Sequence, residues 1–105
     1  MKVLIFKSVF SNKIPIIATF ENKKFEFWGL SLASTVHAAS KVAAYSEGLE
    51  NPSLEDAAIG ASSYELANIE EVSAAEFKRM KTGLVKGKVN EKIKEEFTAL
   101  FRPKA

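Results

Sequence analysis

Residues 14–28 read IPIIATFENKKFEFW, two runs of β-branched and aromatic residues that flank a short polar stretch. Runs of this kind are typical of β-strands. The pair Asn22-Lys23 favours a tight hairpin turn between them, because asparagine tolerates a positive φ angle. A similar run lies at the start of the chain. We therefore expect a three-stranded antiparallel meander, with strands at Lys2 to Phe10, Ile14 to Phe20 and Lys24 to Trp28.

The first of these strands is apolar on both sides. Val3 and Ile5 point to one side of the strand, and Leu4 and Phe6 point to the other. A strand buried on one side alternates apolar with polar residues, and this one does not. Either helices cover both faces of the sheet, or a second chain covers one of them, as in many small oligomeric domains.

A long helix is expected directly after the meander. Gly29 ends the third strand, and the hydroxyl of Ser31 or Ser34 caps the start of the helix. The helix runs to about Glu47, with Gly48 as a left-handed terminator.

The middle of the chain holds a short helix and one ambiguous segment. Ser53-Leu54-Glu55-Asp56 has the pattern of a capping box, and its helix ends near Gly60. Tyr64 to Val72 fits a fourth strand, although Leu66, Ile69 and Val72 also fit helical spacing. We favour the strand, because a well-marked helix start follows it.

Two further helices are expected near the C-terminus. Ser73-Ala74-Ala75-Glu76 is a second capping box, and its helix ends at Gly83. Leu84 to Val89 is a basic connector. Asn90 then caps a last helix that ends at Arg102-Pro103.

These elements indicate one α+β domain over residues 1–105. Its N-terminal sheet has three or four antiparallel strands packed against two to four short helices. The segments are a β-meander (1–30), a helix (31–48), an acidic loop with a short helix and a possible strand (49–72), and two C-terminal helices (73–102).

The composition excludes several classes of protein. The chain has no cysteine, which excludes a disulfide framework, a thiolate zinc site, an iron–sulfur cluster and a cysteine nucleophile. The apolar run Val3 to Phe6 is far shorter than the apolar region of a signal peptide. No segment approaches the roughly 18–20 apolar residues of a membrane-spanning helix. We therefore expect a cytoplasmic protein.

Charge is unevenly distributed along the chain. Residues 1–46 hold six lysines and two glutamates, residues 47–77 hold eight acidic and no basic residues, and residues 78–105 hold nine basic and three acidic residues. Three explanations are open. The acidic and basic segments pack against each other within the monomer, or they pair between subunits or with a partner protein. In the third explanation the basic segment binds nucleic acid. The candidate basic patch comprises Lys78, Arg79, Lys81, Lys86, Lys88, Lys92 and Lys94.

Candidate catalytic groups are few. His37 is the only histidine, and Ser40 and Lys41 share its helix face, but no G-x-S-x-G nucleophile elbow is present. The adjacent carboxylates of Glu55-Asp56 and of Glu70-Glu71 point in different directions, so neither pair forms a site by itself. We therefore expect no enzyme, no metal site and no cofactor.

The junction between the third strand and the first long helix is a candidate ligand site. A glycine allows close approach of a backbone, a helix start offers unpaired N–H groups, and hydroxyl groups add donors. These features suit a phosphate, with an indole ring available to stack on a base. The residues are Trp28, Gly29, Ser31, Ser34 and Thr35. The same residues also suit a simple turn, a helix cap and a core tryptophan.

The sequence thus favours a small non-catalytic binding protein, of accessory or inhibitor type. We expect it to act through protein–protein contacts as a homo-oligomer, without membrane contact. One alternative is a binder of a phosphate-bearing small molecule or nucleotide at the strand–helix junction. The other is nucleic-acid binding through the basic segment Lys78 to Lys94.

Overall fold

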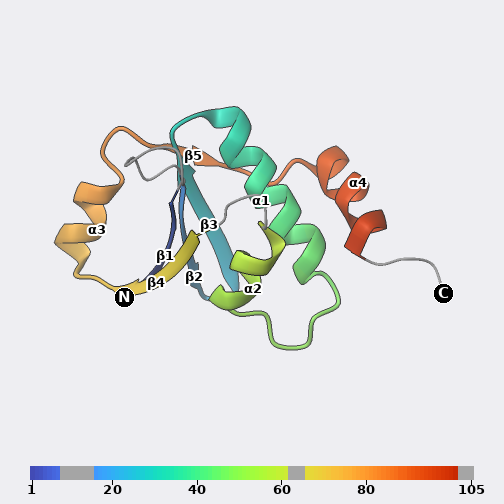
Figure 1. The fold of residues 1–105 in the computed structure, drawn as a ribbon, viewed down its shortest axis with the longest axis horizontal. Coiled ribbons are helices and arrows are strands. Elements are labelled where there is room, and N and C mark those ends of the chain that lie inside the picture. Colours follow the sequence, from blue (N-terminus) through green and yellow to red (C-terminus); the bar gives the residue numbers. More distant parts are fainter. Residues whose placement is uncertain (8–15, 62–65, 102–105) are drawn as a thin grey trace.

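The computed structural model describes residues 1–7, 16–61 and 66–101, which form a five-stranded antiparallel sheet with four helices (Figure 1). The strands are β1 (Lys2–Lys7), β2 (Ile16–Glu21), β3 (Lys24–Gly29), β4 (Leu66–Glu71) and β5 (Val85–Gly87). The helices are α1 (Leu32–Ser46), α2 (Leu54–Gly60), α3 (Ala74–Met80) and α4 (Glu91–Phe101). The expected α+β fold is confirmed. Residues 8–10, 14 and 15 of the expected strands lie outside the described residues.

The sheet has the strand order β4-β1-β2-β3-β5, so β4 and β5 are its two edges. The hairpin between β2 and β3 forms at Asn22-Lys23, as expected, with φ angles of 53° and 60°. These are the left-handed values of a two-residue hairpin turn. Glu21 pairs with Lys24 across the turn, and the rings of Phe20 and Phe25 lie 4.4 Å apart. Turn and ring pair together fix the register of the two strands.

Two strands answer the open questions in the second half of the chain. The favoured strand after residue 64 is confirmed as β4, which pairs with β1, while Tyr64 and Glu65 lie outside the described residues. The connector expected over residues 84–89 contains β5 instead, so the sheet has five strands and not three or four. Three residues centred on a lysine carry almost no strand signal. Pairing with β3 and contact with α1 therefore decide their conformation.

One face of the sheet packs against α1 and α2 and is called the α1 face below. Leu4, Phe6 and Phe27 point to this face and are at most 2% exposed. The helices meet them with small side chains, which allow a close approach of helix to sheet. The helix residues of this core are Ala38, Ala39, Val42, Leu54 and Ala57, with Ala61 just after α2.

The opposite face packs against α3 and is called the α3 face below. Val3, Ile5 and Ile17 lie there and are at most 3% exposed, with Phe77 of α3 over them. Figure 1 shows α3 on one side of the sheet and α1 with α2 on the other. Helices on both faces therefore account for the doubly apolar first strand. The apolar character of this strand is therefore no evidence that a second chain covers one face of the sheet.

The expected helix starts are confirmed. The capping residues of α1 to α4 are Ser31, Ser53, Ser73 and Asn90. The Ser73 hydroxyl, for example, accepts a hydrogen bond of 3.1 Å from the backbone N–H of Glu76. Gly48 has the expected left-handed φ of 85° after α1. α3 ends at Met80, three residues earlier than expected, and no described helix is long and apolar enough to cross a bilayer.

Candidate functional site

The outer side of β3 is only half covered by β5. β5 pairs with Phe27, Trp28 and Gly29, so residues 24–26 of β3, which pair with β2 on their inner side, have no strand on their outer side in the described parts of the chain. After β5 the chain turns away to begin α4, which packs against α1. The sheet edge therefore opens at this point.

Gly87 is the last residue of β5 and lies against α1. A Cβ atom at this position would be 2.5 Å from Cγ2 of Thr35 and 2.8 Å from its carbonyl carbon. Real side chains do not approach so closely, so only glycine lets β5 reach this depth. The contact with Thr35 also assigns Gly87 to the α1 face, which places Lys86, the preceding residue of β5, toward the α3 face.

A cleft of about 340 Å³ lies where β3 and the chain after β5 separate. It is called the edge cleft, and its lining residues are Lys24, Phe25, Glu26, Phe27, Ala39, Lys86, Gly87, Lys88 and Val89. Ligand pockets span roughly 300 to 1,000 Å³, so the edge cleft holds a large side chain or a small ligand. Its walls are mostly apolar and its rim carries three lysines.

The charge of the edge cleft is positive. The Lys86 ammonium lies 2.9 Å from the Glu26 carboxylate, which neutralises one pair. Lys24 and Lys88 form no ion pair with any described residue. Two uncompensated ammonium groups beside apolar walls attract an acidic group that also carries an apolar part.

Trp28 packs on the α3 face beside this edge. Its ring lies edge-on to the Phe77 ring, with centroids 5.3 Å apart and planes at 83°. The ammonium groups of Lys81 and Lys86 lie 5.1 and 5.7 Å from the Trp28 ring centre. These cation–π contacts bring together one residue of the expected ligand junction and two of the expected basic patch. In this arrangement the Trp28 ring packs on the α3 face of the sheet, and the ammonium groups of Lys81 and Lys86 lie over the ring.

The five residues of the expected phosphate junction do not converge. Trp28 faces α3, whereas Thr35 is fully buried on the α1 face beneath Gly87. The hydroxyls of Ser31 and Ser34 lie 2.6 Å apart, and Ser31 caps α1. Thr35 donates its hydroxyl to the carbonyl oxygen of Ser31. The hydroxyl groups that were expected to bind a phosphate therefore form hydrogen bonds within the first turn of α1. Gly29 is buried and pairs with Val85 of β5.

The exposed side chains of this junction are apolar. Leu30, Leu32 and Val85 are 51%, 58% and 41% exposed. Val85 pairs with Gly29, immediately before Leu30, so the three residues lie at one end of the sheet edge. Apolar groups there favour contact with a protein over contact with a phosphate.

The structure does not gather the expected basic patch in one place, although Lys81 and Lys86 meet over the Trp28 ring. Lys78, Arg79 and Lys81 lie on or directly after α3, Lys86 and Lys88 line the edge cleft, and Lys92 and Lys94 lie on α4. α3 and α4 occupy opposite ends of the molecule (Figure 1). Lys94 also lies 3.4 Å from the Glu47 carboxylate, one contact between the acidic and basic segments within the monomer.

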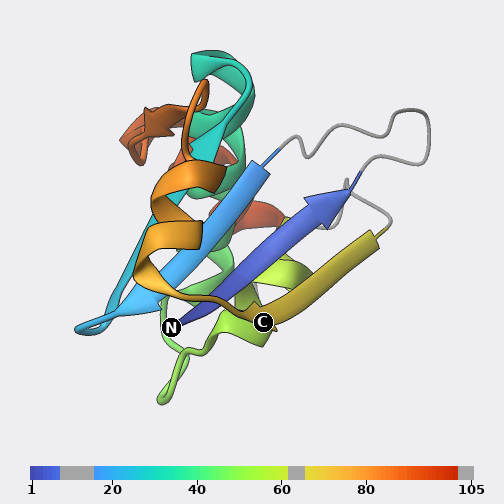
Figure 2. The same cartoon turned by 90° about the vertical axis from the view of Figure 1, so that its left-hand side faces the viewer.

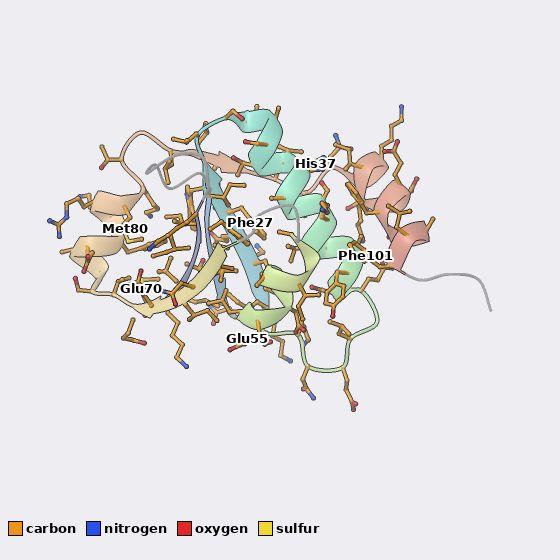
Figure 3. All side chains as sticks on the ribbon, viewed as in Figure 1. Phe27, His37, Glu55, Glu70, Met80 and Phe101 are labelled. Atoms are coloured by element: carbon orange, nitrogen blue, oxygen red, sulfur yellow. The ribbon has the colours of Figure 1, made fainter. Side chains whose placement is uncertain are left out.

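The candidate catalytic residues are engaged elsewhere. His37 lies exposed on α1 (Figure 3). Its ring lies edge-on to the Phe97 ring of α4, with centroids 4.9 Å apart. The buried Ser40 hydroxyl donates to the Val36 carbonyl oxygen and accepts from the backbone N–H of Asn90. Within the described ranges, no three His, Asp or Glu side chains are grouped closely enough to hold a metal ion.

We compared the chain with known protein families, curated proteins and solved structures. No protein-family model, curated protein or solved structure matches the chain. The edge cleft was not predicted from the sequence, because it depends on the point where β5 leaves β3. The one local signal was the glycine in Lys86-Gly87-Lys88, which marks a close backbone approach.

Proposed function

We propose that the protein is a non-catalytic binding protein that takes an acidic segment of a partner protein in the edge cleft. The supporting observation is the combination of apolar walls, an open strand edge and two lysines, Lys24 and Lys88, that form no ion pair with a described residue. An apolar side chain of the partner enters the cleft, and a neighbouring carboxylate meets the rim.

The backbone of β3 adds a directional contact to this proposal. In a two-residue hairpin the residues flanking the turn bond to each other, so Lys24 bonds to β2. Alternation then turns the N–H and C=O of Phe25 outward, toward the side that β5 leaves open. An extended segment that binds an open edge through such groups gains main-chain hydrogen bonds, while pockets for its side chains supply specificity.

The two other functions suggested by the sequence have weaker support. A phosphate ligand at the strand–helix junction would have to displace the hydroxyl contacts that cap α1. A nucleic acid would need aromatic platforms, but Phe97 and Phe101 pack against His37 and Tyr45 of α1. The edge cleft needs neither rearrangement.

A selection from a random displayed-peptide library tests the proposed function. We expect the wild-type protein to enrich acidic peptides with one large apolar residue, and their affinity to fall as salt rises. A Lys24→Glu/Lys88→Glu variant should lose these peptides. The matched control is Lys78→Glu/Arg79→Glu on α3, away from the edge cleft, which should retain them. Absence of enrichment, or equal binding by both double variants, would contradict the proposal.

A further inference from the structure

We infer that copies of this chain associate head to tail, with the β4 edge of one copy docked along the β5 edge of the next. This inference goes beyond the proposed function: it uses the outer side of β5, beside the edge cleft, and names a second copy of the chain as the partner there. β4 and β5 form opposite edges of the sheet, as the strand order requires. Figure 2 shows β4 at one edge, separated from β3 by β1 and β2.

The outer edge of β4 offers free backbone groups. The N–H of Val72 bonds to the carbonyl of Met1 at 2.8 Å, so alternate residues of β4, including Glu70, bond to β1. The intervening residues Ala67 and Ile69 turn their N–H and C=O away from the sheet. No described strand lies on this outer side of β4.

The outer edge of β5 offers a matching backbone position. Phe27 and Gly29 turn their backbone groups toward β5, where they face Gly87 and Val85. The N–H and C=O of Lys86, between these two, therefore point away from β3. This is one free position between residues that are already paired.

A simple shift of one copy along the sheet makes the two edges compatible. β4 and β5 run in the same direction, because four antiparallel pairings lead from one to the other across the sheet. In the resulting parallel pair, Lys86 bonds to residues on either side of Glu70. Glu70 pairs with Val3 of the α3 face, so its side chain and that of Lys86 lie on the same face of the extended sheet.

Charge selects this pairing over the alternatives. Glu70 and Glu71 are exposed on one edge, and Lys86 and Lys88 are exposed on the other. Glu71 and Lys86 already form ion pairs with the Met1 ammonium and with Glu26, so Glu70 and Lys88 supply the net charge of the two edges. Two β4 edges would bring carboxylates together, and two β5 edges would bring ammonium groups together. Only a β4 edge and a β5 edge attract each other. Because this contact joins two different surfaces, it can be repeated from copy to copy and gives a closed ring or an open chain of copies. Because β5 has three residues, we expect weak association that depends on protein concentration.

Reciprocal charge reversal tests the inference by sedimentation velocity over a range of protein and salt concentrations. We expect the wild-type sedimentation coefficient to rise with protein concentration and to fall back with salt. Glu70→Lys alone and Lys86→Glu/Lys88→Glu alone should stay monomeric, and an equimolar mixture of the two should associate again. Glu55→Lys, an exposed change on α2, is the matched control and should behave as the wild type.

A backbone variant guards against misfolding of the charge variants. Glu71→Pro removes the outward N–H that this register pairs with the Lys86 carbonyl, without touching the backbone pairing with β1, so it should abolish association in a protein with unchanged circular dichroism. Ala67→Pro, whose outward N–H lies outside the register, is the matched control and should associate as the wild type does. A wild-type protein that stays monomeric at millimolar concentration, or association that survives the charge variants and Glu71→Pro, would overturn the inference. Acidic peptides that still bind a monomeric wild-type protein would overturn the second copy as partner and leave the proposed function standing.

Discussion

The hydroxyl of Ser40 in α1 accepts a hydrogen bond of 2.8 Å from the backbone N–H of Asn90, fifty positions along the chain. The same hydroxyl donates to the carbonyl oxygen of Val36 at 2.8 Å. Asn90 follows Val89, which lines the edge cleft, and caps α4. One buried hydroxyl therefore fixes the place where the chain leaves the sheet edge.

Replacing Ser40 with alanine should destabilise the protein by about 1–3 kcal/mol, because the N–H of Asn90 would be left without its buried acceptor. Urea unfolding measures this change. The matched control is Ser46→Ala at the end of the same helix. The Ser46 hydroxyl is buried without a hydrogen-bond partner among the described residues, so its loss should be neutral or stabilising. Equal effects of the two changes would contradict the role given to Ser40.

Gly87→Ala should cost about 1–3 kcal/mol and shift β5 away from α1, because the new methyl group would overlap Thr35. A Gly87→Ala/Thr35→Ser double variant removes the overlap with Cγ2 and leaves the two overlaps with the carbonyl carbon and Cβ of residue 35. We therefore expect only partial rescue in the denaturation midpoint. Full stability of the single variant would show that β5 does not need to lie so deep.

Trp28 and Phe77 should be energetically coupled. Each alanine substitution alone should lower stability by about 2–4 kcal/mol, since both rings cover the α3 face of the sheet. Their edge-to-face contact predicts a coupling of about 0.5–1.5 kcal/mol in a double-mutant cycle. Additive losses would mean that the two rings stabilise the fold independently.

Glu71 should make stability depend on acid pH. The N-terminal ammonium of Met1 donates a hydrogen bond of 2.9 Å to its carboxylate and, with its charge, lowers the pKa of Glu71 from 4.5. A lowered folded-state pKa adds stability above the unfolded-state pKa, and that stability is lost as the pH falls through the folded-state value. Glu71→Gln should therefore flatten the stability profile below about pH 4.5. Urea unfolding at a series of acid pH values measures the profile, and a Glu71→Gln variant with the wild-type profile would contradict this role of Glu71.

The sequence was sufficient to predict most of the local structure. Hairpin, caps and strands depend on residues close together in the chain, such as Asn22-Lys23 at the turn and Ser73 with Glu76 at the start of α3. The apolar character of β1 on both sides correctly left helices on both faces as one explanation.

The candidate site could not be predicted in the same way. β5 and the edge cleft depend on contacts across the fold, between Gly87 and Thr35 and between Ser40 and Asn90. The expected phosphate junction was drawn from neighbours in sequence. A residue in β3 and one in α1 can face opposite sides of the sheet, as Trp28 and Thr35 do.

The most direct test of the central claim is to map a selected acidic peptide on the isotope-labelled protein by NMR. We predict the largest amide shifts at Phe25, Lys88 and Val89, with α3 residues such as Arg79 unaffected. Lys24→Glu/Lys88→Glu should abolish the shifts while the rest of the spectrum stays folded. Shifts centred on α3 or on α4, with the edge cleft unchanged, would contradict the account.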